Sequence, residues 1–167
     1  MTLQKFRMFG IVVIVALATA VAAADDAGTR EPPALPQGLE AYLEARVLEA
    51  NGSYREALDA YEIAVREAPD NDEVRVSFAS FLVEVGMAER AVRLLDDRSD
   101  LGAEGIRIKA LALAQLASRQ SDRADEAEAA LREAVAETPD DPNLLFNLAQ
   151  LLVNKGEIVE AERIVAS

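Results

Sequence analysis

The chain has 167 residues, of which 51% are apolar and 5% aromatic, and its formal net charge is −13. This length suits one domain with short appendages, and the negative charge disfavours nucleic acid as a partner because phosphates repel it. The sequence contains neither Cys nor His. Disulfides and thiolate metal sites are therefore excluded, and the residue most often used as a general base or metal ligand is missing.

The first 24 residues have the pattern of a secretory signal peptide. Lys5 and Arg7 precede an uncharged run over 8–24, which ends in three alanines before two aspartates. A basic start, an apolar middle and a small-residue end are typical of a signal peptide that is cleaved. The alternative is an uncleaved membrane anchor, for which this run is close to the minimum length. We expect an exported protein that is periplasmic or extracellular, or one anchored in the inner membrane.

Residues 25–37 are predicted to be a disordered linker. They hold three prolines, one glycine and four charged residues. A segment of this composition cannot bury enough apolar surface to fold by itself. The folded domain is therefore expected over 38–167.

Small residues recur through 38–167 with a period close to 34. One set, separated by 34, 36 and 34 residues, comprises Ala57, Ala91, Ala127 and Ala161. An insertion of two residues near 118–123 explains the one departure from the period. Turn residues that follow the same frame are Gly52, Gly86, Gly156, Pro69 and Pro139. Such a period is the signature of a helical repeat array.

Helix start signals agree with this period. Ser53 followed by Glu56 has the pattern of a capping box, and Asp141 before Pro142 is typical of a helix N-terminus. The acidic segment 70–72 lacks the Gly and the closing Glu of a calcium loop, so it is interpreted as a helix cap. The predicted helices are 39–50, 54–67, 72–84, 88–97, 104–118, 123–137, 143–154 and 157–166.

Three further expectations concern packing. The repeated alanines should let the helices approach closely, and the repeated glycines should adopt the left-handed conformation at helix ends. Tyr54 and Tyr61 are predicted to lie in the core. Gly102 and Gly105 are placed in a linker between helices.

These features resemble the tetratricopeptide repeat family, in which a unit of about 34 residues forms two antiparallel helices. The small residue of the family's first helix matches Ala45, Ala79 and Ala149. The pattern of its second helix matches Ala57, Tyr61, Ala64 and Pro69. The match is poor at the large first-helix residue, where units one and two have Ala41 and Arg75. The resemblance implies an all-α fold, a right-handed superhelical solenoid of about three and a half repeats.

The resemblance also implies a concave face, lined by the first helix of each unit, that binds a protein partner. The candidate protein-binding residues on it are Tyr42, Arg46, Glu49, Val76, Ser80, Val83, Asn143, Phe146, Gln150 and Asn154. The other inward positions are Leu39, Ala50, Glu73, Glu84 and Val153. Aromatic side chains there can anchor a partner, and amide side chains can pair with a peptide backbone.

The predicted function is a non-catalytic protein–protein interaction scaffold or adaptor of the cell envelope, which binds a peptide or helix in its concave groove. No catalytic constellation is recognisable, so neither an enzyme nor a cofactor or metal is expected. One alternative is a self-associating or membrane-tethered structural module that works through an uncovered C-terminal edge of Ile158, Ile164 and Val165. Another is an accessory subunit of an envelope assembly complex, for cytochrome maturation or polysaccharide export. The last repeat looks incomplete, so a longer repeat protein or a partner covering this edge is expected.

Overall fold

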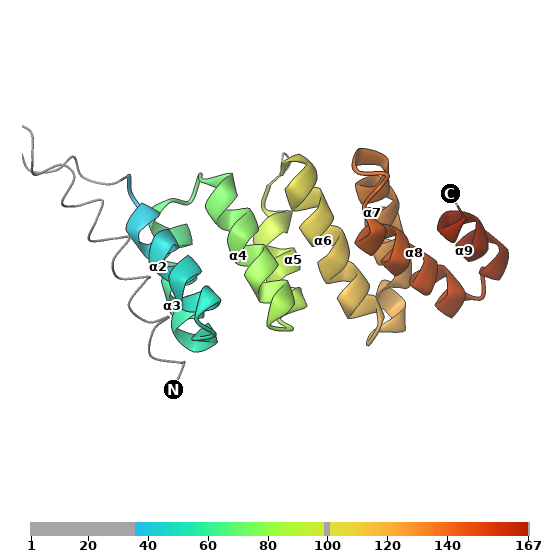
Figure 1. The fold of residues 1–167 in the computed structure, drawn as a ribbon, viewed down its shortest axis with the longest axis horizontal. Coiled ribbons are helices and arrows are strands. Elements are labelled where there is room, and N and C mark those ends of the chain that lie inside the picture. The colour runs from blue at the N-terminus through green and yellow to red at the C-terminus, as the bar shows by residue number, and fades with distance from the viewer. Residues whose placement is uncertain (1–35, 99–100, 167) are drawn as a thin grey trace, which may run out of the picture. The chain divides into compact units, whose positions relative to one another are not determined.

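The computed structural model describes residues 36–98 and 101–166 (Figure 1). Within these ranges the chain forms eight α-helices and one short 3₁₀ turn, and it contains no strand. The predicted signal peptide of 1–24, and all but the last two residues of the predicted linker, lie outside the described residues.

The helices form four pairs, each of two consecutive helices. The pairs are α2 (Leu39–Ala50) with α3 (Tyr54–Glu67), α4 (Asp72–Glu84) with α5 (Ala88–Asp96), α6 (Gly102–Ala117) with α7 (Ala124–Glu137), and α8 (Pro142–Lys155) with α9 (Ile158–Val165). The 3₁₀ turn Ser121–Arg123 precedes α7, at the predicted insertion. All eight predicted helices are confirmed, with each end within two residues of its expected position.

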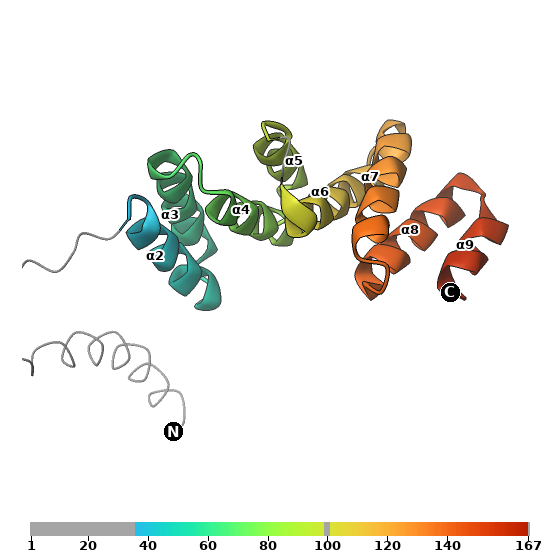
Figure 2. The same cartoon turned by 90° about the horizontal axis from the view of Figure 1, so that it is seen from above.

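The pairs stack along a solenoid through their first helices. Helix α4 contacts α6, α6 contacts α8, and α5 and α7 each contact the first helix that follows them. Figure 2 shows α4, α6 and α8 following one another in a row. Each pair therefore shares its apolar surface with its neighbours, as the solenoid architecture requires.

The repeated small residues lie in the core. Ala57, Ala91, Ala127 and Ala161 are all buried, and they belong to one core cluster that extends from α2 to α9. Any larger side chain would force the helices of a pair apart, because protein cores are close-packed.

The helix ends agree with the sequence in all but one case. Gly52, Gly86 and Gly156 have φ of 75°, 79° and 84°, which is the left-handed region that favours glycine. Asp141 accepts hydrogen bonds from two backbone N–H groups of the first turn of α8, as predicted. The predicted capping box at Ser53 is wrong, because the Ser53 side chain makes no capping hydrogen bond to α3. Its ψ of 62° departs from the extended conformation that a capping residue needs.

Two packing predictions are also wrong. Tyr61 is fully buried as expected, but Tyr54 begins α3 and is 56% exposed, with its ring tilted against that of Phe81 at a centroid distance of 6.2 Å. Gly102 and Gly105 do not lie in a linker, since α6 begins at Gly102. Gly105 is buried, and a Cβ there would lie 2.5 Å from the Cβ of a neighbouring leucine, so the absence of a side chain permits the helix to pack.

Arg75 fills the place of the family's large first-helix residue. Its side chain is buried and donates to two backbone carbonyls, that of Leu94 at 3.0 Å and that of Pro69 at 2.8 Å. Leu94 lies in the last turn of α5, where carbonyls lack helical partners, so a cation is favoured there. Arg75 therefore joins the end of α5 to the turn between α3 and α4.

Candidate protein-binding surface

On the first helix pair, the predicted binding residues are engaged within the chain. The Tyr42 hydroxyl lies 3.0 Å from the Ser77 hydroxyl on α4. Glu49 accepts a hydrogen bond from the buried Tyr61 hydroxyl at 2.7 Å and pairs with Arg46 at 3.1 Å. Burial, and then the bond to Glu49, raises the pKa of Tyr61, so this hydroxyl stays a donor at physiological pH. Of these residues only Arg46 is exposed.

On the second pair, α6 covers much of the predicted face. Val76, Ser80 and Val83 are all half-buried. A Cβ at Gly105 of α6 would lie 3.3 Å from a methyl group of Val76. The amide nitrogen of Gln115, also on α6, donates to the backbone carbonyl of Val83 at 3.4 Å. These three residues therefore contribute little free surface.

On α8, by contrast, all of the predicted residues are exposed. Phe146 is 66% exposed, and Asn143, Gln150 and Asn154 are open to solvent beside it. Gln150 and Asn154 also share a long hydrogen bond of 3.4 Å. The exposed apolar and amide groups of the predicted face are thus concentrated on α8.

A hollow of about 500 Å³ lies between α8 and α9, and we refer to it as the α8–α9 hollow. Its lining consists of Phe146, Ala149, Gln150, Val153, Ile158, Ala161, Glu162, Val165 and Ala166. Most of these side chains are apolar, and Glu162 is the one charged residue among them. Helix α8 supplies one wall and α9 the other, with the buried Ala149 and Ala161 between them.

The α8–α9 hollow unites two surfaces that the sequence analysis treats separately. The sequence places Phe146 on the concave face, and Ile158 and Val165 at a C-terminal edge. All three line the same hollow. Ile164, the other residue of the predicted edge, is half-buried and packs against the core instead. The prediction that Ile164 is uncovered is therefore wrong, because this side chain packs against the core.

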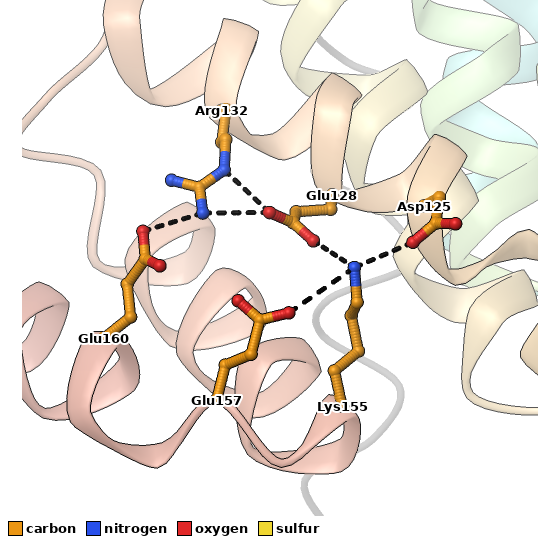
Figure 3. A network of polar contacts seen from close by, with 6 residues as sticks. All are labelled: Asp125, Glu128, Arg132, Lys155, Glu157 and Glu160. Atoms are coloured by element: carbon orange, nitrogen blue, oxygen red, sulfur yellow. Dashed lines mark hydrogen bonds and ion pairs between the residues drawn. The ribbon is translucent and has the colours of Figure 1, made fainter.

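A network of ion pairs joins α8 and α9 to α7 (Figure 3). The Lys155 ammonium lies 2.7 Å from Asp125 and 2.5 Å from Glu128. Arg132 pairs with Glu128 and with Glu160, each at 2.8 Å. Asp125, followed by Glu128, raises the pKa of Lys155, while Lys155 lowers the pKa of both carboxyl groups. Each group thus keeps its charge at neutral pH, which suits a structural contact.

A second hollow, of about 520 Å³, lies between α6 and α7. Charged side chains, among them Arg98, Lys109 and Glu126, contribute to its lining. Its lining also includes Leu101.

Two further features concern only the residues that the structure describes. No cluster of three or more acidic side chains there could hold a metal ion. No described helix is both long enough and apolar enough to cross a membrane.

The sequence profile of the family described as "Tetratricopeptide repeat" matches residues 48–116 and 118–167. Among solved structures, MamA from Desulfovibrio magneticus RS-1 is 15% identical, with 77% of this chain and 72% of that one covered and a TM-score of 0.67. TTC0263, a thermophilic TPR protein of Thermus thermophilus, is 20% identical, with 77% of this chain and 71% of that one covered and a TM-score of 0.61. At these identities the likeness concerns the fold. No curated protein sequence matches the chain significantly.

Proposed function

Because the chain belongs to the tetratricopeptide repeat family, we propose that it is a scaffold that binds a partner protein in the α8–α9 hollow. Members of this family are protein-interaction scaffolds, and their fold is typically non-catalytic. The observation that carries the proposal is the exposure of Phe146 and Val165 in one apolar hollow of about 500 Å³. Large exposed apolar side chains that gather in a concave patch mark interaction sites.

The rest of the predicted face supports this choice of surface. Tyr42 and Glu49 are held by contacts to α4 and α3, and Val83 is covered by α6. A partner would have to break these contacts to use them, which would weaken its binding. The exposed amide of Gln150 lines the hollow and is hydrogen-bonded to the exposed Asn154, so the two side chains can provide the polar rim that interfaces usually have.

We also propose that this scaffold works in the cell envelope. The support is the sequence of residues 1–24, with its basic start, apolar run and small-residue end. Mass spectrometry of the protein isolated from the cells that make it tests the proposal. A mature chain that begins at Asp25 or Ala24 is expected, whereas an intact N-terminus would favour the membrane-tethered alternative.

A pull-down from envelope extract tests the function itself. The purified protein is compared with a double variant, Phe146→Ala and Val165→Lys, and with Arg46→Ala as the matched control on α2. We expect one partner to be recovered by the protein and by Arg46→Ala but lost by the double variant. Loss with Arg46→Ala alone would place binding on the first helices. The identity of the partner also tests an accessory role in cytochrome maturation or polysaccharide export.

A further inference from the structure

The α8–α9 hollow lies on the last helix pair at the position that α4 occupies on the first helix pair. Three of its lining residues follow three tyrosines of that pair at the same separation of 104 residues. The matched residues are Tyr42 and Phe146, Tyr54 and Ile158, and Tyr61 and Val165. Because the repeats are built alike, these residues occupy equivalent positions on the two pairs.

In the first pair, α4 contacts all three tyrosines. The contacts are Tyr42 with Ser77, Tyr54 with Phe81, and Tyr61 with Phe78. Tyr61 and Phe78 are stacked with their ring centroids 5.3 Å apart. The residues that match Tyr42 and Tyr61 are exposed instead, since Phe146 is 66% and Val165 74% exposed, whereas Tyr54 and its match Ile158 are both partly open to solvent. The structure thus shows what fits such a place, which is a helix.

Two of the three helices that fill such places within the chain, α4 and α8, share a pattern of large apolar residues, whereas α6 has Ile108, Ala112 and Gln115 at the same positions. On α4 and α8 the buried residues recur with the spacing i, i+4 and i+7. They are Val74, Phe78 and Phe81 on α4, and Leu144, Leu148 and Leu151 on α8. A helix seated in the α8–α9 hollow needs the same stripe of large apolar side chains.

Charge adds a second condition. Glu162 of the hollow lies 34 residues after Glu128 of α7, so the two occupy equivalent positions. Glu128 is paired with Lys155, the last residue of the helix seated there. Lys155 is at i+11, counted from Leu144. An occupant of the hollow would place its own i+11 residue opposite Glu162, where a cation is favoured.

We propose that the α8–α9 hollow binds an amphipathic helix of a partner protein, with large apolar residues at i, i+4 and i+7 and Lys or Arg at i+11. This inference rests on the proposed function and specifies the chemistry of its partner. The net charge of −13 also favours a basic partner helix.

A second copy of this chain fits the hollow poorly. Its helix α2 would be the one to dock head to tail, and it exposes Leu43 and Val47. On α2 the position equivalent to Val74 of α4 is Glu40. The residues at i and i+4 are therefore Glu40 and Glu44, and the residue at i+11 is Asn51. Two carboxylates would thus meet an apolar hollow, which is unfavourable without cationic partners.

The test uses a fluorescent peptide that copies residues 142–155, with Phe146→Gln and Val153→Gln in the peptide to keep it soluble. Its binding to the purified protein is measured by fluorescence anisotropy. We expect saturable binding that Val165→Asp in the protein abolishes. Glu162→Lys in the protein should weaken binding about tenfold, and Lys155→Glu in the peptide should restore it. Asp59→Lys, an exposed site on α3 with the same charge change, should leave binding unaltered.

The inference is overturned if the peptide does not bind, or if Val165→Asp does not affect its binding. It is also overturned if Lys155→Glu in the peptide does not restore binding to the Glu162→Lys protein. If the envelope partner is still captured through the hollow while the peptide fails, the proposed function stands and only the helix pattern is wrong. If the partner is not captured either, both fail. Self-association that Val165→Asp removes in sedimentation experiments would identify a second copy as the occupant and overturn the inference.

Discussion

Phe146 of α8 and Val165 of α9 line one hollow from two different helices, and they are 66% and 74% exposed. By sequence position the first belongs to the concave face and the second to the C-terminal edge. A substitution at Phe146 alone therefore cannot distinguish groove binding from edge binding. The comparison needs a residue far along the stack, and Arg46 on α2 is exposed and suitable.

The exposed lining of the hollow should contribute little to folding. Replacing Phe146 by Gln and Val165 by Lys should change the free energy of unfolding by less than about 1 kcal/mol, because both side chains are largely solvated. Leu148→Ala on α8, which empties a buried position, should cost about 2–5 kcal/mol. Urea denaturation measures both values. Equal losses would mean that the hollow is part of the core.

Arg75 should stabilise the fold through its two carbonyl contacts. Arg75→Met keeps much of the volume but leaves the Leu94 carbonyl without its donor, so we expect a loss of about 1–3 kcal/mol. Arg93→Met, at an exposed site on α5, is the matched control and should change stability by less than about 0.5 kcal/mol. If both variants were equally stable, the buried guanidinium would have no structural role.

Close helix approach at the repeated alanines should make them intolerant of larger side chains. Ala91→Leu inserts a larger group at a fully buried position and should cost about 1–3 kcal/mol or more. Ala129→Leu on α7, which is exposed, should have almost no effect on the melting temperature. A stable Ala91→Leu variant would show that the pairs can separate without cost.

The network around Glu128 predicts a dependence of stability on acid. Hydrogen bonding to Lys155, together with Arg132, lowers the pKa of Glu128 in the folded chain. The contribution of Glu128 to the free energy of unfolding is fully present above the pKa of the unfolded chain, about 4.3. It is lost as the pH falls through the lower pKa of the folded chain. Glu128→Gln should therefore reduce stability at neutral pH by about 1 kcal/mol or less. It should also flatten the fall in stability as the pH drops below about 5.

Thermal unfolding at several pH values measures this effect. Glu133→Gln, an exposed carboxylate on the same helix, serves as the control and should retain the acid dependence of the unaltered chain. Identical pH profiles for the Glu128→Gln variant and the unaltered chain would contradict the structural role of the network.

Local signals are enough to predict the helices. The spacing of Ala57 and Ala91, the left-handed glycines and the Asp141 cap depend on nearby residues, and all are confirmed. The prediction at Ser53 is wrong because a capping residue also needs an extended backbone, which its sequence does not reveal.

Contacts between repeats are harder to predict. Arg75 is a mismatch in the repeat pattern because its carbonyl partners lie on other elements, at Leu94 and Pro69. Equivalent positions on different repeats also differ in what covers them, as Tyr42 and Phe146 demonstrate. The repeat frame shows that these two positions correspond, but only the packing of α4 shows that the first is engaged.

Hydrogen exchange of the protein with and without its captured partner tests the central claim most directly. Binding in the α8–α9 hollow predicts added protection in peptides from 142–166, with little change in peptides from 39–84. Protection confined to 39–84, with 142–166 unaltered, would contradict the assignment of this hollow as the partner site.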